Sequence, residues 1–259
     1  MDLGIRGKKG IVGGASAGLG RACALALARE GVELTVVART AANIESAAAE
    51  ISSTTRVRVI PVAADYNSDE GRAAVLQNCP EPDIIVNNSG GPPTGNFRDW
   101  DRAAWMAALN NNMLGAVFMI KETVDGMIAR KFGRIINITS SAVKAPISIL
   151  GLSNSARAGL TGFVAGTSRE VAKHNVTINN ILPGDFDTER HQANTRDMAK
   201  VQNRTYEEMR EIRTAAVAAG RFGEPAELGD LCAYLCSAQA GFITGQNLLI
   251  DGGKYPGTF

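Results

Sequence analysis

The sequence predicts an α/β protein with one doubly wound parallel sheet and helices on both of its faces. Short apolar runs alternate with longer amphipathic stretches along the whole chain, and most of the short runs are rich in Val and Ile. Such runs are typical of strands covered on both faces. Strand–helix alternation of this kind favours right-handed crossovers and a parallel sheet. A chain of 259 residues is long enough to bury the large core that such a sheet requires.

The individual elements follow from the same periodicity. Strands are expected at residues 10–12, 33–38, 57–63, 83–87, 133–139, 176–182 and 247–251, and helices at 20–30, 41–52, 112–130, 153–173 and 226–237. Residues 188–220 interrupt this rhythm, because they are polar and of mixed charge, with a helical stretch near 206–219. Long excursions from compact domains are often functional. This segment is therefore either a substrate lid or a pair of surface helices.

Composition and charge exclude several classes of protein. The chain is 45% hydrophobic and 20% charged, as in ordinary globular proteins, and its formal net charge is +1. A balance this close to neutral does not indicate a nucleic-acid or membrane partner. There is no apolar run of about 20 residues and no signal-peptide core. We expect one domain over residues 1–259, located in the cytoplasm, since nothing in the sequence resembles a linker or a repeat.

Potential metal ligands are sparse. The only histidines are His174 and His191, and the cysteines are Cys23, Cys79, Cys232 and Cys236. Cys232 and Cys236 are four residues apart in an expected helix, but no further Cys or His has a matching spacing. We expect buried or idle thiols in a reducing compartment, no disulfide and no metal site.

A glycine-rich loop follows the first expected strand. Residues 13–20 read Gly-Gly-Ala-Ser-Ala-Gly-Leu-Gly, and a run of good helix formers comes next. Glycines at 14, 18 and 20 allow a tight turn and a close approach of the backbone to a pyrophosphate. A helix that starts at Gly20 would present free N–H groups and a positive dipole end to that anion. The loop predicts a dinucleotide site.

Further motifs follow in order along the chain. Asn87-Asn88-Ser89-Gly90 ends the fourth strand, Asn112 precedes Gly115, Pro183-Gly184 precedes Thr188, and Thr244-Gly245-Gln246 and Asp251-Gly252-Gly253 lie near the C-terminus. With the spacing Gly14-xxx-Gly18-x-Gly20, they resemble the short-chain dehydrogenase/reductase family, in particular its β-ketoacyl-carrier-protein-reductase-like subgroup. The resemblance covers nearly the whole chain. It implies a Rossmann-type fold and the interconversion of a small-molecule carbonyl and an alcohol with a nicotinamide cofactor.

The resemblance also implies which residues hold the cofactor. They are Gly14, Ser16, Ala17, Gly18, Leu19, Gly20, Asp65, Asn88, Ser89, Gly90, Arg157, Pro183, Gly184 and Thr188. The end of the second strand decides between the two dinucleotides, because an acidic residue there accepts a hydrogen bond from the ribose 2′-hydroxyl of NAD. Ala38 and Arg39 stand at that end. An arginine can pair with a 2′-phosphate, so we expect NADP rather than NAD.

The catalytic positions implied by the resemblance hold unusual residues. The family uses a serine at the end of the fifth strand, a tyrosine about thirteen residues later, and a lysine four residues after that. Ser140 fits the first role, but Ser153 and Arg157 occupy the tyrosine and lysine positions, directly before Ala158-Gly159-Leu160. Asn112 completes the implied catalytic set.

Ser153 cannot replace a tyrosine as a proton donor. A tyrosine has a pKa of about 10, whereas that of an aliphatic hydroxyl is nearer the value for water, about 15.7. The difference amounts to about 8 kcal/mol against the deprotonated form. Positions 153 and 157 share one face of a helix. Arg157 could therefore offer fixed positive charge to a developing alkoxide, while Ser140 and Ser153 hold a water that supplies the proton.

Two functional hypotheses remain open. One is an NADP(H)-dependent oxidoreductase with an atypical active site, and the other is a non-catalytic dinucleotide-binding sensor or scaffold. A proton from Tyr206 or His191 in a closed lid is a further option within the first. The family's usual pairing, through the helices at 112–130 and 153–173 and the C-terminal strand region, predicts a homotetramer or homodimer.

Overall fold

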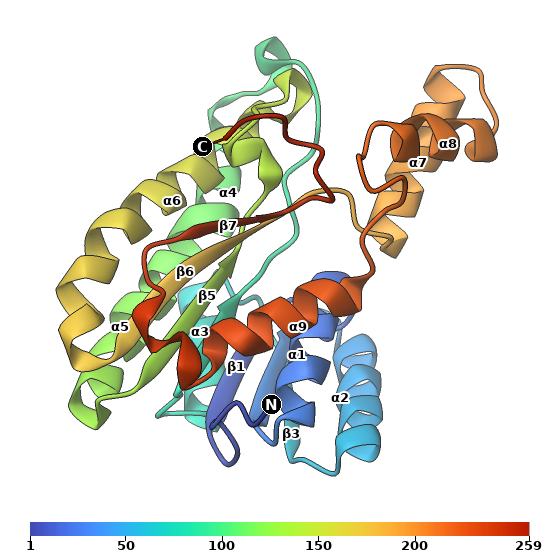
Figure 1. Cartoon of the computed structure of the whole chain (residues 1–259). Helices are drawn as coiled ribbons and strands as arrows, with labels where there is room; N and C mark the ends of the chain where they lie inside the picture. Colours follow the sequence, from blue (N-terminus) through green and yellow to red (C-terminus); the bar gives the residue numbers. More distant parts are fainter. Residues whose placement is uncertain (259) are drawn as a thin grey trace.

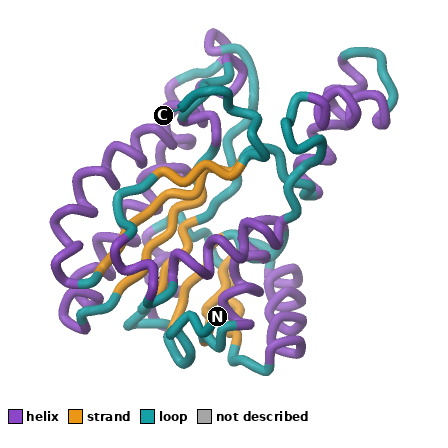
Figure 2. Tube along the Cα trace, in the orientation of Figure 1, coloured by secondary structure: helices purple, strands orange, loops and turns teal. Residues whose placement is uncertain are grey.

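Residues 1–258, which the computed structural model describes, contain one seven-stranded sheet in the order β3-β2-β1-β4-β5-β6-β7 (Figure 2). Every neighbouring pair is parallel. The strands are β1 (Lys9–Gly13), β2 (Glu33–Ala38), β3 (Val59–Ala63), β4 (Ile84–Asn87), β5 (Gly133–Ile138), β6 (Val176–Pro183) and β7 (Asn247–Ile250). The strand order reverses between β1 and β4. The predicted doubly wound sheet is confirmed, and its crevice lies at this switch point.

Helices cover both faces of the sheet (Figure 1). They are α1 (Gly18–Arg29), α2 (Ala41–Thr55), α3 (Asp69–Asn78), α4 (Arg102–Leu109), α5 (Gly115–Arg130), α6 (Gly151–Val171), α7 (Glu189–Val201), α8 (Tyr206–Ala215) and α9 (Pro225–Cys236). One core cluster joins α1, α2 and α9 to the sheet. A second cluster joins α3, α5 and α6 to the opposite face.

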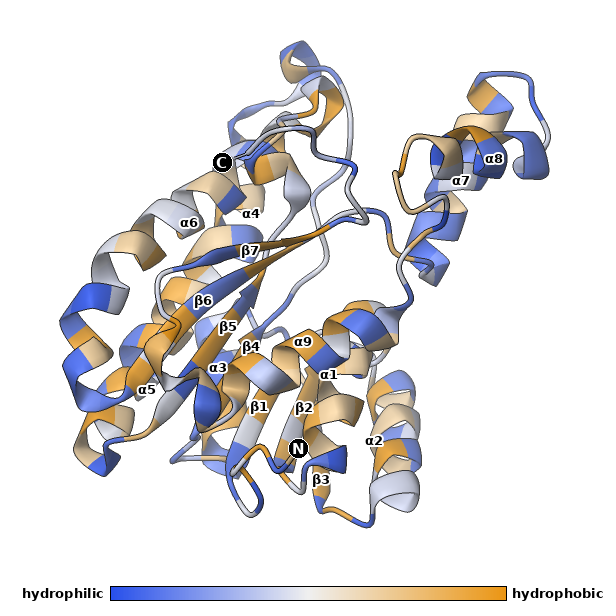
Figure 3. Ribbon diagram, viewed as in Figure 1, coloured by the Kyte–Doolittle hydropathy of each residue, from blue (hydrophilic) through white to orange (hydrophobic). Residues whose placement is uncertain are grey.

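The two cores follow from the alternation of side chains along each strand. Val12 and Ile136 lie in the first cluster, whereas their neighbours Ile11 and Ile135 lie in the second. All four are fully buried. Successive side chains of a strand point to opposite faces, so a strand covered on both faces needs apolar side chains on both of them. In Figure 3, α7 is by contrast coloured as largely polar.

A row of asparagines, of which all but Asn247 are buried, connects four neighbouring strands. The Nδ2 atoms of Asn87, Asn137 and Asn180 donate hydrogen bonds to the Oδ1 atoms of Asn137, Asn180 and Asn247 at 2.8, 3.0 and 2.8 Å. The Tyr66 hydroxyl donates to Asn87 Oδ1 at 2.6 Å. The ladder satisfies polar groups that would otherwise be costly to bury. It also fixes the register of β4 to β7 next to the crevice.

The helix before β5 is longer than the predicted 112–130. It runs as α4, a π-helical turn at Asn110–Leu114, and α5. By length and composition alone, Arg102–Arg130 could also cross a membrane, with a mean hydropathy of 1.2 over its most apolar window. In the structure, its residues Met119, Ile120 and Met127 are buried against the sheet. The second core thus covers part of this helix, and 28% of its most apolar window is buried.

The polar segment 188–220 contains two helices, α7 and α8, which project from the body of the molecule (Figure 1). The second ends at Ala215, four residues before the predicted end at 219. The first begins directly after Thr188, whose side-chain oxygen accepts a hydrogen bond from the backbone N–H of His191 at 3.2 Å. This is an ordinary N-terminal cap, and it starts α7 beside the crevice.

Candidate dinucleotide and substrate site

A cavity of about 760 Å³ opens at the carboxyl ends of the strands. Ligands of open α/β sheets bind at this position. The predicted cofactor residues that line it are Gly14, Ser16, Ala17, Gly18, Leu19, Arg39, Asp65, Asn88, Ser89, Gly90, Arg157, Pro183 and Thr188. Gly20 and Gly184 do not line it. A Cβ on Gly20 would collide with the Gly14 carbonyl oxygen, and one on Gly184 would lie 2.6 Å from Asp251 Cβ. Gly20 and Gly184 thus allow close packing against Gly14 and Asp251.

The glycine loop is shaped to bind an anion. Gly14 and Gly18 have φ angles of +58° and +57°, in the left-handed region that favours glycine. The side-chain amide of Asn88, at the end of β4, donates to the Gly13 carbonyl at 3.2 Å and so braces the loop. Helix α1 begins at Gly18, earlier than the predicted Gly20, and no side chain caps it. Its first N–H groups are therefore available to a phosphate.

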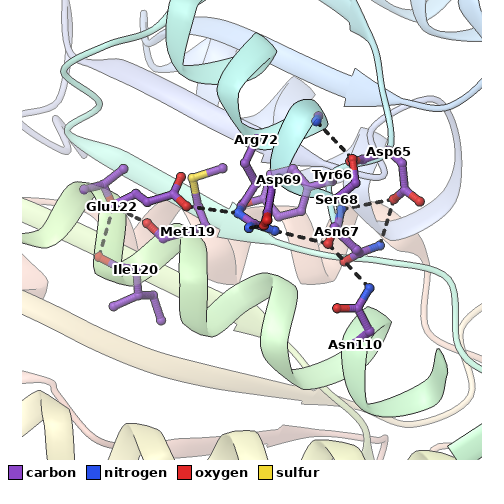
Figure 4. A network of polar contacts seen from close by, with 12 residues as sticks. Asp65, Tyr66, Asn67, Ser68, Asp69, Arg72, Asn110, Met119, Ile120 and Glu122 are labelled. Carbon is purple, nitrogen blue, oxygen red and sulfur yellow. Dashed lines mark hydrogen bonds and ion pairs between the residues drawn. The ribbon is translucent and has the colours of Figure 1, made fainter. Parts of the chain in front are cut away.

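The loop after β3 is held by a buried arginine (Figure 4). Arg72 donates from Nη1 to the Asn67 carbonyl at 3.1 Å and from Nε to Glu122 Oε1 at 3.2 Å, and it also pairs with Asp69. Asp65 Oδ1 accepts from the Asn67 backbone N–H at 3.0 Å. This fixes Asp65 at one end of the cavity. On the neighbouring strand end, Arg39 is exposed, and it takes part in no ion pair within residues 1–258.

Arg157 is a buried cation that has no counter-ion among residues 1–258. It is 8% exposed, and its Nε donates to Ser153 Oγ at 3.2 Å and its Nη1 to the Ile138 carbonyl at 2.7 Å. None of the ion pairs in the described part of the chain includes it. Burial lowers its pKa to about 10, with a further contribution from nearby Arg190. Arg157 thus stays protonated at neutral pH and carries positive charge into the wall of the cavity.

The two serines predicted to be catalytic are not among the residues that line the cavity. Ser153 is buried, and its oxygen accepts from Arg157, as the four-residue spacing predicts. Ser140 lies two residues after the end of β5, and its oxygen accepts from the Ala142 backbone N–H at 3.1 Å. Ser153 is therefore in place to orient the guanidinium group, and the Ser140 hydroxyl proton remains free for another acceptor.

Asn112 lies within the π-helical turn between α4 and α5. Such turns are frequent at functional sites. Asn112 is buried and lines the main cavity, and its Oδ1 accepts no hydrogen bond from the described residues. A smaller cavity of about 20 Å³ connects it to Arg157. That volume is enough for one water, which needs about 10–15 Å³.

Tyr66 also lines the cavity, although sequence spacing does not predict it. Its hydroxyl donates to Asn87, and burial raises its pKa well above the ordinary tyrosine value. It is therefore poorly suited to give or take a proton. Arg190 is a second lining residue that the sequence motifs missed. Its position two residues after Thr188 is the sequence feature that could have indicated it.

The lid residues considered as proton donors lie outside the cavity. His191 Nε2 is 3.0 Å from Asp185 Oδ1, and the imidazole ring packs on Phe222 at 4.4 Å between centroids. Tyr206, on α8, stacks instead with Arg196. Neither is among the residues that line the cavity.

Asp185 anchors α7 and α8 to the body. Its Oδ1 also accepts from Arg213 Nη2 at 2.8 Å, and its Oδ2 accepts from Lys254 Nζ at 2.5 Å. Burial alone would raise the pKa of this carboxyl, but the hydrogen bonds from His191 and Lys254, with Arg213 nearby, hold it well below its usual range. The carboxylate thus remains charged at any ordinary pH.

Comparison with known proteins places this geometry in a family. Residues 14–254 match a family model described as enoyl-(acyl carrier protein) reductase. The chain is 32% identical to the 3-oxoacyl-(acyl-carrier-protein) reductase FabG of Vibrio cholerae over 98% of its own length and 99% of that protein's length. The chain belongs to the short-chain dehydrogenase/reductase family. The family predicted from the motifs is confirmed, including its β-ketoacyl-reductase-like subgroup.

Two other reductases resemble the chain over nearly their whole length. The NADPH-dependent reductase BacG of Bacillus subtilis is 29% identical over 94% of this chain and 96% of its own. The structure of L-sorbose reductase from Gluconobacter frateurii, solved with NADPH and L-sorbose, superposes with a TM-score of 0.94 at 29% identity. The superposition covers 99% of this chain and 100% of the L-sorbose reductase chain.

Proposed function

We propose that this protein is an NADP(H)-dependent oxidoreductase that interconverts a carbonyl and an alcohol, with Arg157 as its essential cation. The observation that carries the proposal is the unpaired, buried guanidinium group beside a crevice of dinucleotide size. The names of BacG and of the L-sorbose reductase structure, both of which include NADPH, support the choice of cofactor. So does Arg39, which lines the cavity at the end of β2.

The residues present fit such a dinucleotide. The free N–H groups of α1 and the glycine loop would hold its pyrophosphate, Arg39 its 2′-phosphate, and Asp65 its adenine end. The bound cofactor supplies or accepts the hydride. Everything else in the reaction falls to the side chains of this protein.

Arg157 provides electrostatic stabilisation. A fixed positive charge in a water-poor wall stabilises negative charge that develops on the substrate oxygen, and it needs no reorganisation to do so. Ser153 Oγ, which accepts from Arg157 Nε, holds the guanidinium group in one orientation. The proton reaches the substrate oxygen from a water held by Asn112 Oδ1, and the hydroxide that remains is reprotonated from solvent. This relay takes over the role of the absent tyrosine.

Segment 188–220 is proposed to close over the substrate, since α7 starts at the crevice and carries Arg190 into it. We further propose that the protein works in the cytoplasm as a homotetramer or homodimer formed through α5 and α6. The non-catalytic alternative, a dinucleotide-binding sensor or scaffold, is favoured by one observation. The only tyrosine among the residues that line the cavity, Tyr66, is bonded to Asn87.

The test is NADPH oxidation with a panel of ketones and aldehydes. Loss of a single preorganised donor typically costs about 10²–10³ in kcat, and Arg157→Ala should lose at least that much. Arg157→Lys should also be impaired, because an ammonium group cannot reproduce the planar fork. Ser153→Ala should lose only a few-fold. Activity that survives Arg157→Ala unchanged refutes the arginine mechanism.

The paired change Ser153→Tyr with Arg157→Lys addresses the alternative. If the parent protein oxidises NADPH with none of the carbonyl compounds and the paired variant does so, the parent binds the cofactor without catalysing the reaction.

A further inference from the structure

Arg190 brings a second positive charge to the cavity. It lies in the first turn of α7, lines the cavity and is exposed. Its Nη2 donates to the Gly91 carbonyl at 3.2 Å. Within residues 1–258 it takes part in no ion pair, and the same is true of Arg157.

The two guanidinium groups line the same cavity, and the charge of Arg190 contributes to the lowered pKa of Arg157. Like charges brought together at one cavity wall repel, and an anion placed between them would relieve that repulsion. The cavity does contain two carboxylates, Asp65 and Glu189. Neither pairs with Arg157 or Arg190, and Asp65 is bonded to Asn67.

The geometry distinguishes this position from that of the pyrophosphate. Thr188 faces the glycine loop, because a Cβ built on Gly18 would lie 3.6 Å from Thr188 Cγ2. Two residues later, Arg190 instead reaches Gly91, beyond the end of β4, where Pro92 and Pro93 continue the cavity wall. The start of α7 thus presents Thr188 to the glycine loop and Arg190 to Gly91, the residue that follows Gly90.

We propose that Arg190 selects a substrate that carries an oxyanion, a carboxylate in particular, close to its reacting carbonyl. The carboxylate pairs with the Arg190 fork, and the carbonyl oxygen points to Arg157. The fork–carboxylate geometry suits arginine, which binds carboxylates in a bidentate manner. This inference rests on the proposed function, because it assigns the substrate class of the same site.

The experiment measures binding rather than turnover. Calorimetric titration of the NADP⁺-loaded protein uses three acids, 2-oxobutanoate, acetoacetate and phenylpyruvate, each with its methyl ester. At least one acid should bind about tenfold more tightly than its ester, as expected for one exposed charge-assisted contact. In Arg190→Gln this preference should disappear, while the Kd for NADPH changes less than twofold. Arg196→Gln removes the same charge from the exposed side of α7 and should leave the preference intact.

Two results overturn the proposal. If acid and ester bind equally in all three pairs, Arg190 does not bind a substrate carboxylate. A weaker NADPH Kd in Arg190→Gln, with the acid preference retained, means that the arginine serves a cofactor phosphate. Failure of the proposed function gives a different pattern, in which the acids bind preferentially but NADPH is never oxidised.

Discussion

Replacement of Arg39 by alanine tests the cofactor assignment. Arg39 is exposed at the end of β2, lines the cavity and has no acidic partner within the described chain. A hydrogen bond to a charged group contributes about 1.5–3 kcal/mol, and exposure places Arg39 at the lower end of that range. At about 1.4 kcal/mol per factor of ten, NADPH binding should weaken about tenfold. NADH lacks the 2′-phosphate, so its Kd should stay nearly unchanged.

The assay is fluorescence titration of each reduced cofactor into the parent protein, Arg39→Ala and a control, Arg58→Ala. Arg58 is an exposed arginine that does not line the cavity, so its removal should leave both Kd values unchanged. The parent should bind NADPH more tightly than NADH. Equal or tighter NADH binding by the parent refutes the assignment, as does a loss of NADH affinity in Arg39→Ala as large as that of NADPH.

Asp185→Asn should free α7 and α8 and speed up tryptic cleavage within 188–220. In the parent, the pKa of this carboxylate lies below its usual value of about 3.9. Its contribution to the stability of the fold is therefore present above that pH and lost as the pH falls further. Equal cleavage rates in parent and variant would contradict the anchoring role. Asn137→Leu leaves the buried amides of Asn87 and Asn180 without their partner, so the free energy of unfolding measured in urea should fall by about 1–3 kcal/mol per unsatisfied group. An unchanged denaturation midpoint would show that the ladder adds no stability. Sedimentation should show a parent dimer or tetramer, and Gly162→Arg, on the exposed face of α6, should dissociate it; a monomeric parent contradicts the proposed assembly.

The sheet could be predicted well because strands buried on both faces carry short runs rich in Val and Ile. β5 and β6 were placed to within a residue of their observed ends for this reason. Helix boundaries were less accurate. Arg102–Leu109 was not predicted as a helix, because its register continues into α5 only through a π-helical turn, which shifts the face that the side chains occupy.

The motifs located the cavity but not every residue that lines it. Gly14, Gly18 and Asn88 were found because local backbone geometry and close approach require them. Arg190 and Tyr66 were missed, since they reach the cavity only through tertiary placement of α7 and of the loop after β3. The sequence could not predict either that Arg157 is buried or that it pairs with no carboxylate of residues 1–258, because residue spacing does not show which side chains meet in the folded protein.

Transfer of a labelled hydride tests the central claim most directly. The parent protein is incubated with NADPH that carries deuterium at nicotinamide C4, together with the carbonyl panel, and the products are analysed by mass spectrometry. The account predicts an alcohol with deuterium on its former carbonyl carbon, formed by the parent and at least a hundredfold more slowly by Arg157→Ala. If no product acquires deuterium although the protein binds NADPH, the account is contradicted and the protein is a dinucleotide-binding protein without this chemistry.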